Sequence, residues 1–345
     1  MLQNTQPTQP DRETELIACL TDSASRAGIC FDRSAIVNFY IALKSKPLVI
    51  LTGPEKSGKI ALVQCLARSL MGTDCQQCQM MTGHPWSFEK SANIALVAEA
   101  QIRLNTDKFL CLLEEAWQPE NTRRVFIACI TRISPAELLS FFTEVAFQLR
   151  HGQLMRFGDI HFSVPLPFPP NLFLIGTMDT QYFDWWDGDL LSEATIISEP
   201  TVSLLPSSNP RKSFTSWECE FLQSSLRNRQ AVYHKIHAIL GCQRQPLRPL
   251  LQIEALLGTH ATLYSGSLVD EAMVYLGNSW SRLGNGLFDR SNSGNLRTAL
   301  DLAIAQILLP HSVDPLRDNA TLRERLLDIM SDQFPRSAMF VSALA

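Results

Sequence analysis

The sequence predicts an α/β protein, with a parallel sheet covered by helices on both faces and then a smaller, all-helical region. Three observations lead to this prediction. Short apolar runs alternate with helical periodicity through the first 200 residues, as they do in parallel sheets. One of these runs ends in a turn with two glycines that leads directly into a helix. Beyond residue 226 the apolar positions recur only at helical spacing.

The composition is that of a folded chain of about two domains. Of its 345 residues, 46% are hydrophobic and 19% are charged, which excludes a disordered chain, a coiled coil and a collagen-like fibre. Thirty basic side chains against 34 acidic ones give a net charge of −4. The overall charge therefore gives no support for binding to nucleic acid or to an anionic membrane.

The apolar segments and the cysteines indicate a cellular compartment. No run of 18 apolar residues is present, and residues 1–14 are polar and lack the apolar segment of a secretory signal. The nine cysteines are odd in number and scattered through apolar stretches, which is typical of reduced cysteine. We therefore expect a cytoplasmic protein without a membrane span.

The elements follow from periodicity in chain order. Helices are expected within 15–46, and the continuous apolar run 47–52 predicts a strand buried on both faces, followed by a helix at 60–70. Further helices are expected at 92–104 and 135–149. The remaining expected strands are 77–82, 109–113, 171–177 and 194–198, with a β-hairpin insert at 150–168.

These elements divide the chain into four parts. Residues 1–14 are expected to be a disordered tail, and 15–200 an α/β core that includes the N-terminal helices. A segment rich in serine and proline, 201–225, is expected to link this core to a helical domain at 226–345.

The most informative segment is the turn after the first buried strand, which matches the P-loop pattern G-x-x-x-x-G-K. Chance predicts roughly 0.02 matches in a chain of this composition. The glycines let backbone N–H groups point at phosphate oxygens, the following helix N-terminus favours an anion, and the lysine reaches the β- and γ-phosphates. The sequence thus predicts that ATP or GTP binds at Gly53, Pro54, Glu55, Lys56, Ser57, Gly58, Lys59 and Ile60.

The last position of this motif departs from the usual pattern. A serine or threonine normally stands there, and its hydroxyl coordinates Mg²⁺. Ile60 has no oxygen on its side chain and cannot ligate a metal. We therefore expect a weakened Mg²⁺ site.

Two acidic residues follow the apolar run 109–113 in the manner of a Walker B segment. If that run is a strand, Glu114 and Glu115 lie at its carboxyl end, where α/β sheets bind ligands. Glu114 would then hold the magnesium and Glu115 would polarise the attacking water. The alternative is a pair of acids that favours the start of a helix.

Several segments resemble the AAA+ ATPases of the McrB type, the motor subunits of modified-cytosine restriction systems. The similar stretches are IALKSKPLVILTGPEKSGKIALVQCLA, GHPWSF, FLCLLEEAWQPE and PPNLFLIGTMDT, with SLVDEAMVY and ALDLAIAQILLP resembling the helical lid. The resemblance implies a P-loop AAA+ core, a lid, and ring-like homo- or hetero-oligomers whose nucleotide sites are shared between subunits. It also implies a nuclease or another effector as partner.

The chain departs from that family at catalytic positions. Asp179 stands where the family has the sensor asparagine, Glu193 where it has an arginine that reaches the neighbouring nucleotide, and Glu114 where it has aspartate. An arginine finger contributes about 10³–10⁵ in rate, and a glutamate adds negative charge instead. We expect nucleotide binding with weak or lost hydrolysis, which leaves open whether the chain is an enzyme. The alternative is a pseudo-ATPase scaffold in a hetero-oligomer that needs no turnover.

Overall fold

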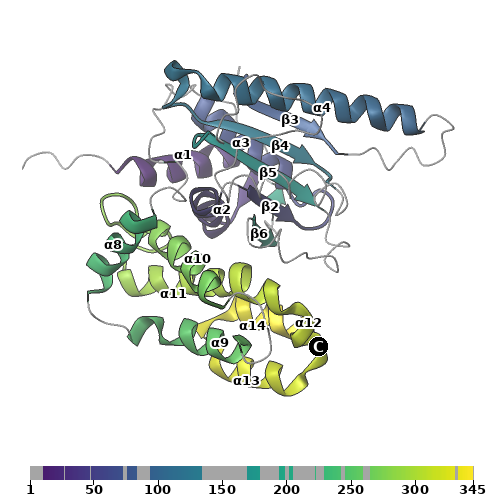
Figure 1. Cartoon of the computed structure of the whole chain (residues 1–345). Coiled ribbons are helices and arrows are strands. Elements are labelled where there is room, and N and C mark those ends of the chain that lie inside the picture. The colour runs from purple at the N-terminus through teal and green to yellow at the C-terminus, as the bar shows by residue number, and fades with distance from the viewer. Residues whose placement is uncertain are drawn as a thin grey trace, which may run out of the picture.

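The computed structural model contains a sheet with flanking helices and a group of helices packed beneath them (Figure 1). The sheet lies in the first 200 residues, and the helices packed beneath it lie after residue 228. The structure describes residues 11–26, 28–46, 48–72, 76–83, 94–133, 169–178, 194–198, 202–204, 222, 229–241, 245–258, 265–330 and 333–344.

Five parallel strands form the central sheet in the order β3-β4-β5-β2-β6. β2, which comes first in the chain among these five strands, lies between two strands that come much later in the sequence, and Thr52 at its end is level with Met178 and Ser198. The carboxyl ends of these strands therefore meet at one edge, beside the point where the strand order reverses. The strands are β2 Leu48–Thr52, β3 Cys78–Thr82, β4 Phe126–Thr131, β5 Leu172–Met178 and β6 Ala194–Ser198.

Helices cover both faces of the sheet, because successive strand residues point to opposite sides. Val49 and Leu51 of β2 belong to the same hydrophobic cluster as the helices α1 Arg12–Arg26, α2 Arg33–Ser45 and α3 Lys59–Met71. Leu48 and Ile50 belong to a second cluster with α4 Ile94–Trp117. In Figure 1, α4 runs along one face of the sheet and α2 lies on the other. The α/β class and four of the five predicted strands are thus confirmed.

The expected strand at 109–113 is wrong, because this segment lies inside α4. Its buried side chains are Phe109, Leu112, Leu113 and Ala116, whereas Cys111 between them is exposed. That spacing of three and four residues is helical, and a five-residue apolar run alone does not distinguish a strand from one face of a helix. The strand that fills this place in the sheet is β4, which the sequence analysis missed.

The structure differs from two further expectations near the boundaries of the expected segments. Helix α1 begins at Arg12, inside the expected tail 1–14. Within the expected linker, β7 Val202–Leu204 pairs antiparallel with β1 Ile29–Phe31. The hairpin at 150–168 and the helix at 135–149 lie outside the described residues.

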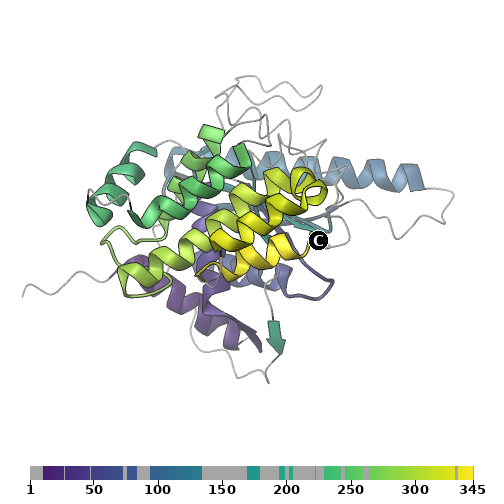
Figure 2. The ribbon, with the colours of Figure 1, turned by 90° about the horizontal axis from the view of Figure 1, so that it is seen from below.

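The part of the C-terminal region that the structure describes is helical, as predicted. Its main helices are α8 Arg229–Leu240, α9 Arg248–Gly258, α10 Ser265–Asn278, α11 Asn292–Ala303, α12 Val313–Asp318, α13 Ala320–Met330 and α14 Pro335–Ser342. Figure 2 shows these helices spread beneath the sheet-containing part. None of the helices described is both long and apolar enough to cross a membrane.

The helical region shares a hydrophobic core with the N-terminal helices. Helix α10 packs on α2, and the Tyr275 hydroxyl donates to Asn38 Oδ1 at 2.5 Å. The Asn278 amide donates to Ser45 Oγ at 3.1 Å. One continuous cluster contains side chains of α1, α2 and α10 through α14. The boundary between the two regions is therefore a packed interior.

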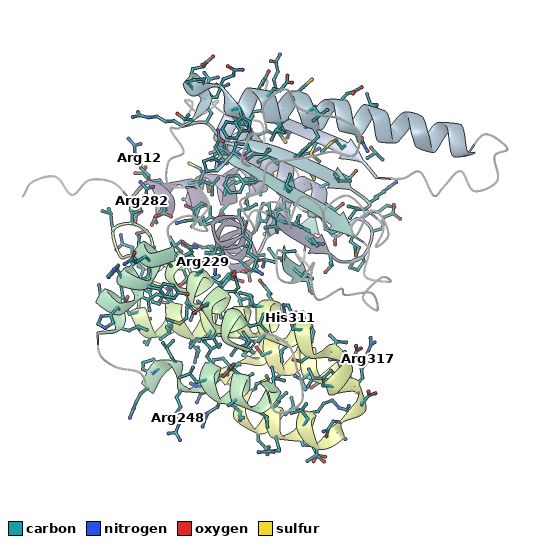
Figure 3. The ribbon with its side chains drawn as sticks, in the orientation of Figure 1. Arg12, Arg229, Arg248, Arg282, His311 and Arg317 are labelled. Carbon is teal, nitrogen blue, oxygen red and sulfur yellow. The ribbon has the colours of Figure 1, made fainter. Side chains whose placement is uncertain are left out.

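A buried carboxylate holds three segments together at this junction. Glu13 of α1 is 2% exposed. It accepts hydrogen bonds from the Tyr40 hydroxyl at 2.7 Å, from the Lys44 ammonium, and from the Arg282 backbone N–H at 2.6 Å. Figure 3 shows Arg282 beside the N-terminal helix and Arg248 at the outer side of the helical region. Because Arg282 follows α10, this carboxylate joins the N-terminal and C-terminal parts of the chain.

Candidate phosphate-binding site

The P-loop residues lie between the carboxyl end of β2 and the first turn of α3. The backbone has positive φ at Gly53 (147°), Lys56 (68°) and Gly58 (86°). Two of these positions are the motif glycines, which adopt positive φ without steric cost. Gly58 is the N-cap of α3 and no side chain caps that terminus, so the positive end of the helix dipole faces the loop.

Lys59 lies across this loop. Its residue is 7% exposed, and its ammonium donates to the Gly53 carbonyl, to the Pro54 carbonyl at 2.7 Å and to Ser57 Oγ at 3.3 Å. The lysine charge is therefore held within the loop, where the sequence motif predicts that it contacts phosphate.

Two described side chains next to the loop, Thr52 and Ile60, are poor metal ligands. Ile60 is apolar and 36% exposed. The Thr52 hydroxyl is buried and donates to the Ile197 carbonyl at 3.3 Å. Over the residues that the structure describes, no group of three or more His, Cys, Asp or Glu side chains is arranged to hold a metal ion.

Strand β4, which β5 separates from β2, brings an arginine to the same edge. Arg132 follows the end of β4, and its Nη2 lies 2.9 Å from Oε1 of Glu55 in the P-loop. Arg132 has a φ of 57°, and its backbone N–H donates to Thr177 Oγ1 at 2.9 Å. A cation thus lies just beyond the carboxyl end of β4, beside Glu55 of the P-loop. The sequence analysis missed it, because no motif marks Arg132.

The structure places Glu114 and Glu115 far from the loop. Both lie in the last turn of α4, where the Asn171 amide donates to the Ala116 carbonyl at 3.3 Å. Asn171 directly precedes β5, so this end of α4 lies at the amino ends of the strands. The seven residues of β5 span about 20 Å, and the P-loop lies at the other edge.

To hold the metal and to polarise the water, Glu114 and Glu115 would have to lie at the carboxyl edge of the sheet. Those assignments are therefore corrected, and their physical reason is that a helix, not a strand, carries the two acids. A signal for the true strand was present in the sequence, since residues 125–130 form an apolar run that is followed by a threonine and an arginine. Asp179 and Glu193 lie outside the described residues.

Comparison with known proteins adds little to this geometry. No family model matches the chain. No curated protein matches it. Among solved structures, a DNA polymerase III gamma subunit-related protein from Thermotoga maritima MSB8 is similar over 91% of each chain, at 14% identity and a TM-score of 0.27. A likeness this distant carries no argument about activity, which has to come from the residues themselves.

Proposed function

We propose that this chain binds ATP or GTP through residues 53–60, as an AAA+ subunit of McrB-like type with weak or lost hydrolysis. The observation that carries the proposal is the P-loop at the carboxyl end of β2, with the buried Lys59 ammonium inside it. A polyphosphate is the ligand that suits backbone N–H groups, a helix N-terminus and a fixed ammonium together.

The charges around the loop support slow turnover. Hydrolysis needs carboxylates that hold magnesium and orient water, and an arginine that neutralises the transition state. In the described part of the carboxyl edge, β4 ends in Thr131 and Arg132 in place of acids. Glu193 replaces the family arginine. The sensor role of Asp179 stays a prediction.

The missing arginine supports an oligomeric role. In a ring-like assembly, a neighbouring subunit supplies groups that this chain lacks, and its own helical region contacts the next core. A homo-oligomer would repeat Glu193 at every site, so a hetero-oligomer with an active partner or an effector subunit fits the sequence better.

Calorimetric titration with ATP and with GTP tests the binding proposal. We expect a Kd of about 1–100 μM for one of them, a range that corresponds to −8 to −5 kcal/mol. Lys59→Met should weaken binding at least about tenfold, whereas Lys108→Met in α4 should leave it unchanged. No heat from either nucleotide would overturn the proposal.

A phosphate-release assay tests the weak hydrolysis separately. Ordinary enzymes turn over at about 1 s⁻¹ or faster, and we expect this chain to be well below that rate. A turnover of about 1 s⁻¹ that Lys59→Met abolishes would show that catalysis survives.

A scaffold without bound nucleotide is the second candidate. The observation that favours it is the Lys59 ammonium, whose donors contact the carbonyls of Gly53 and Pro54 and the Ser57 hydroxyl. The loop is thus internally satisfied. Mass measurement of the assembly with and without ATP separates the two candidates, because a scaffold assembles equally well in both conditions.

A further inference from the structure

We propose that this site takes its nucleotide without Mg²⁺, and that the Arg132 guanidinium supplies the positive charge that the metal supplies in P-loop ATPases. This inference rests on the proposed nucleotide binding. It follows from a disagreement between the side chains around the loop and the ligands that magnesium requires.

The residues that the structure describes around the loop do not fit magnesium. Mg²⁺ is held by oxygen ligands, chiefly carboxylates, in addition to phosphate and water. Ile60 offers no oxygen, and the hydroxyls of Thr52 and Thr131 donate to the Ile197 and Met81 carbonyls. In the described part of this edge, the one carboxylate at the loop is Glu55, which pairs with Arg132.

The Arg132 backbone is held in an unusual conformation. Its φ of 57° lies in the left-handed region that glycine enters freely and that a long side chain rarely adopts. The turn is fixed by Thr177, which accepts from the Arg132 N–H and, through its carbonyl, from the Ile133 N–H at 2.9 Å. A Cβ on Gly83 would meet the Arg132 carbonyl at 2.7 Å. The packing therefore fixes the direction in which this side chain leaves the backbone.

Glu55 holds the guanidinium at the loop and is easily displaced. The two side chains are 66% and 64% exposed, and an ion pair in water is weak. A phosphate group carries more charge than a carboxylate and fits the planar guanidinium fork equally well. A phosphate that enters the loop can therefore take the place of the Glu55 carboxylate on Arg132.

The sign of the magnesium effect follows from the charges. Lys59 and Arg132 both place positive charge at the loop. Chelation by Mg²⁺ removes two negative charges from the nucleotide and thus weakens its attraction to both. Because no described carboxylate gains a contact with the metal in return, free ATP should bind as tightly as Mg·ATP or more tightly.

Calorimetric titration of the full chain with ATP, in EDTA and in Mg²⁺, tests this inference. For the unmodified protein we expect a Kd in EDTA equal to or up to about threefold below the Kd in Mg²⁺. Arg132→Gln should weaken binding in EDTA about tenfold or more. Glu55→Gln should tighten it about threefold, because the competing carboxylate is gone. Arg124→Gln, an exposed arginine at the other end of β4, should change nothing.

The outcomes separate this inference from the nucleotide-binding proposal. Binding that tightens about tenfold or more on adding Mg²⁺, or that is unchanged in Arg132→Gln, overturns the role of Arg132 and leaves nucleotide binding intact. No binding in either buffer overturns both. If Arg132→Gln lowers the Tm, weaker binding by that variant is not used to judge the role of Arg132. Glu55→Gln and Arg132→Lys, which keeps the charge, are tested in its place. Unchanged binding in Glu55→Gln then overturns the inference.

Discussion

Replacing Glu13 with alanine should strongly destabilise the folded chain. The Glu13 carboxylate accepts from the Tyr40 hydroxyl, the Lys44 ammonium and the Arg282 backbone N–H, and it is buried. The substitution removes this acceptor from all three donors at once. Because they come from α2 and from the segment after α10, the loss falls on the junction between the two halves of the chain.

The size of the destabilisation follows from the groups that remain buried after the Glu13 carboxylate is removed. The Lys44 side chain is 5% exposed, and removing one member of a buried ion pair costs about 3–5 kcal/mol because the other charge remains in the interior. Each neutral donor that loses its acceptor costs about 1–3 kcal/mol more. Partial relaxation offsets some of this, so we expect a total at the low end of the combined range, about 5 kcal/mol.

Urea unfolding followed by circular dichroism measures this cost. Glu15→Ala is the matched control, because Glu15 is an exposed acid in the same helix and should change stability by about 0.5 kcal/mol or less. The double variant Glu13→Gln with Lys44→Met removes both charges and should recover most of the loss. If Glu13→Ala unfolds at the same urea concentration as Glu15→Ala, the buried ion pair does not stabilise the junction as argued.

Three more predictions concern the helical region. Burial lowers the pKa of Lys235 to about 8, so its charge opposes folding and stability should rise between about pH 8 and 10.5, by up to about 3 kcal/mol. Lys235→Met should abolish this rise in urea unfolding at pH 7.5 and 9.5, and an identical rise in the variant would contradict it. Trp280→Ala, at a fully buried position, should cost about 3–5 kcal/mol, whereas Met339→Ala at a 68% exposed position should be nearly neutral; similar melting of both would refute the packing argument. Gly277→Ala would put a Cβ 2.3 Å from Val232 Cγ1 and should cost about 1–3 kcal/mol, a prediction that an unchanged Tm would exclude.

Much of the sheet could be predicted because its strands are buried on both faces. Such strands read as continuous apolar runs, as in 47–52, 171–177 and 194–198. The P-loop could be predicted because its glycines and lysine stand at fixed spacing between a strand and a helix. These signals are local, so no tertiary information was needed to find them.

The errors arose where local signals are ambiguous or absent. The run 109–113 suits either a strand or the buried face of a helix, and only the helical continuation to Trp117 decides between them. Arg132 reaches the loop through contacts with Thr177 and Glu55, which lie 45 and 77 positions away in the sequence. No spacing rule connects residues so distant.

Residues 12–14 of the expected tail lie in a helix for a related reason. Residues 12–14 are polar and look like a frayed end, yet Glu13 is buried in the folded chain. Its partners are 27, 31 and 269 positions away. A charged residue in a polar segment therefore looked exposed, although tertiary contacts bury it.

The packing of α2 against α10 limits how the helical half can move. Helix α2 leads within three residues into β2, and β2 leads directly into the P-loop. Figure 1 shows α2 between the sheet and α10. If the helical half rotated relative to the sheet, either α2 would move with it or the Tyr275–Asn38 hydrogen bond would break. A displacement of the helical half would therefore be transmitted through α2 to β2 and the P-loop.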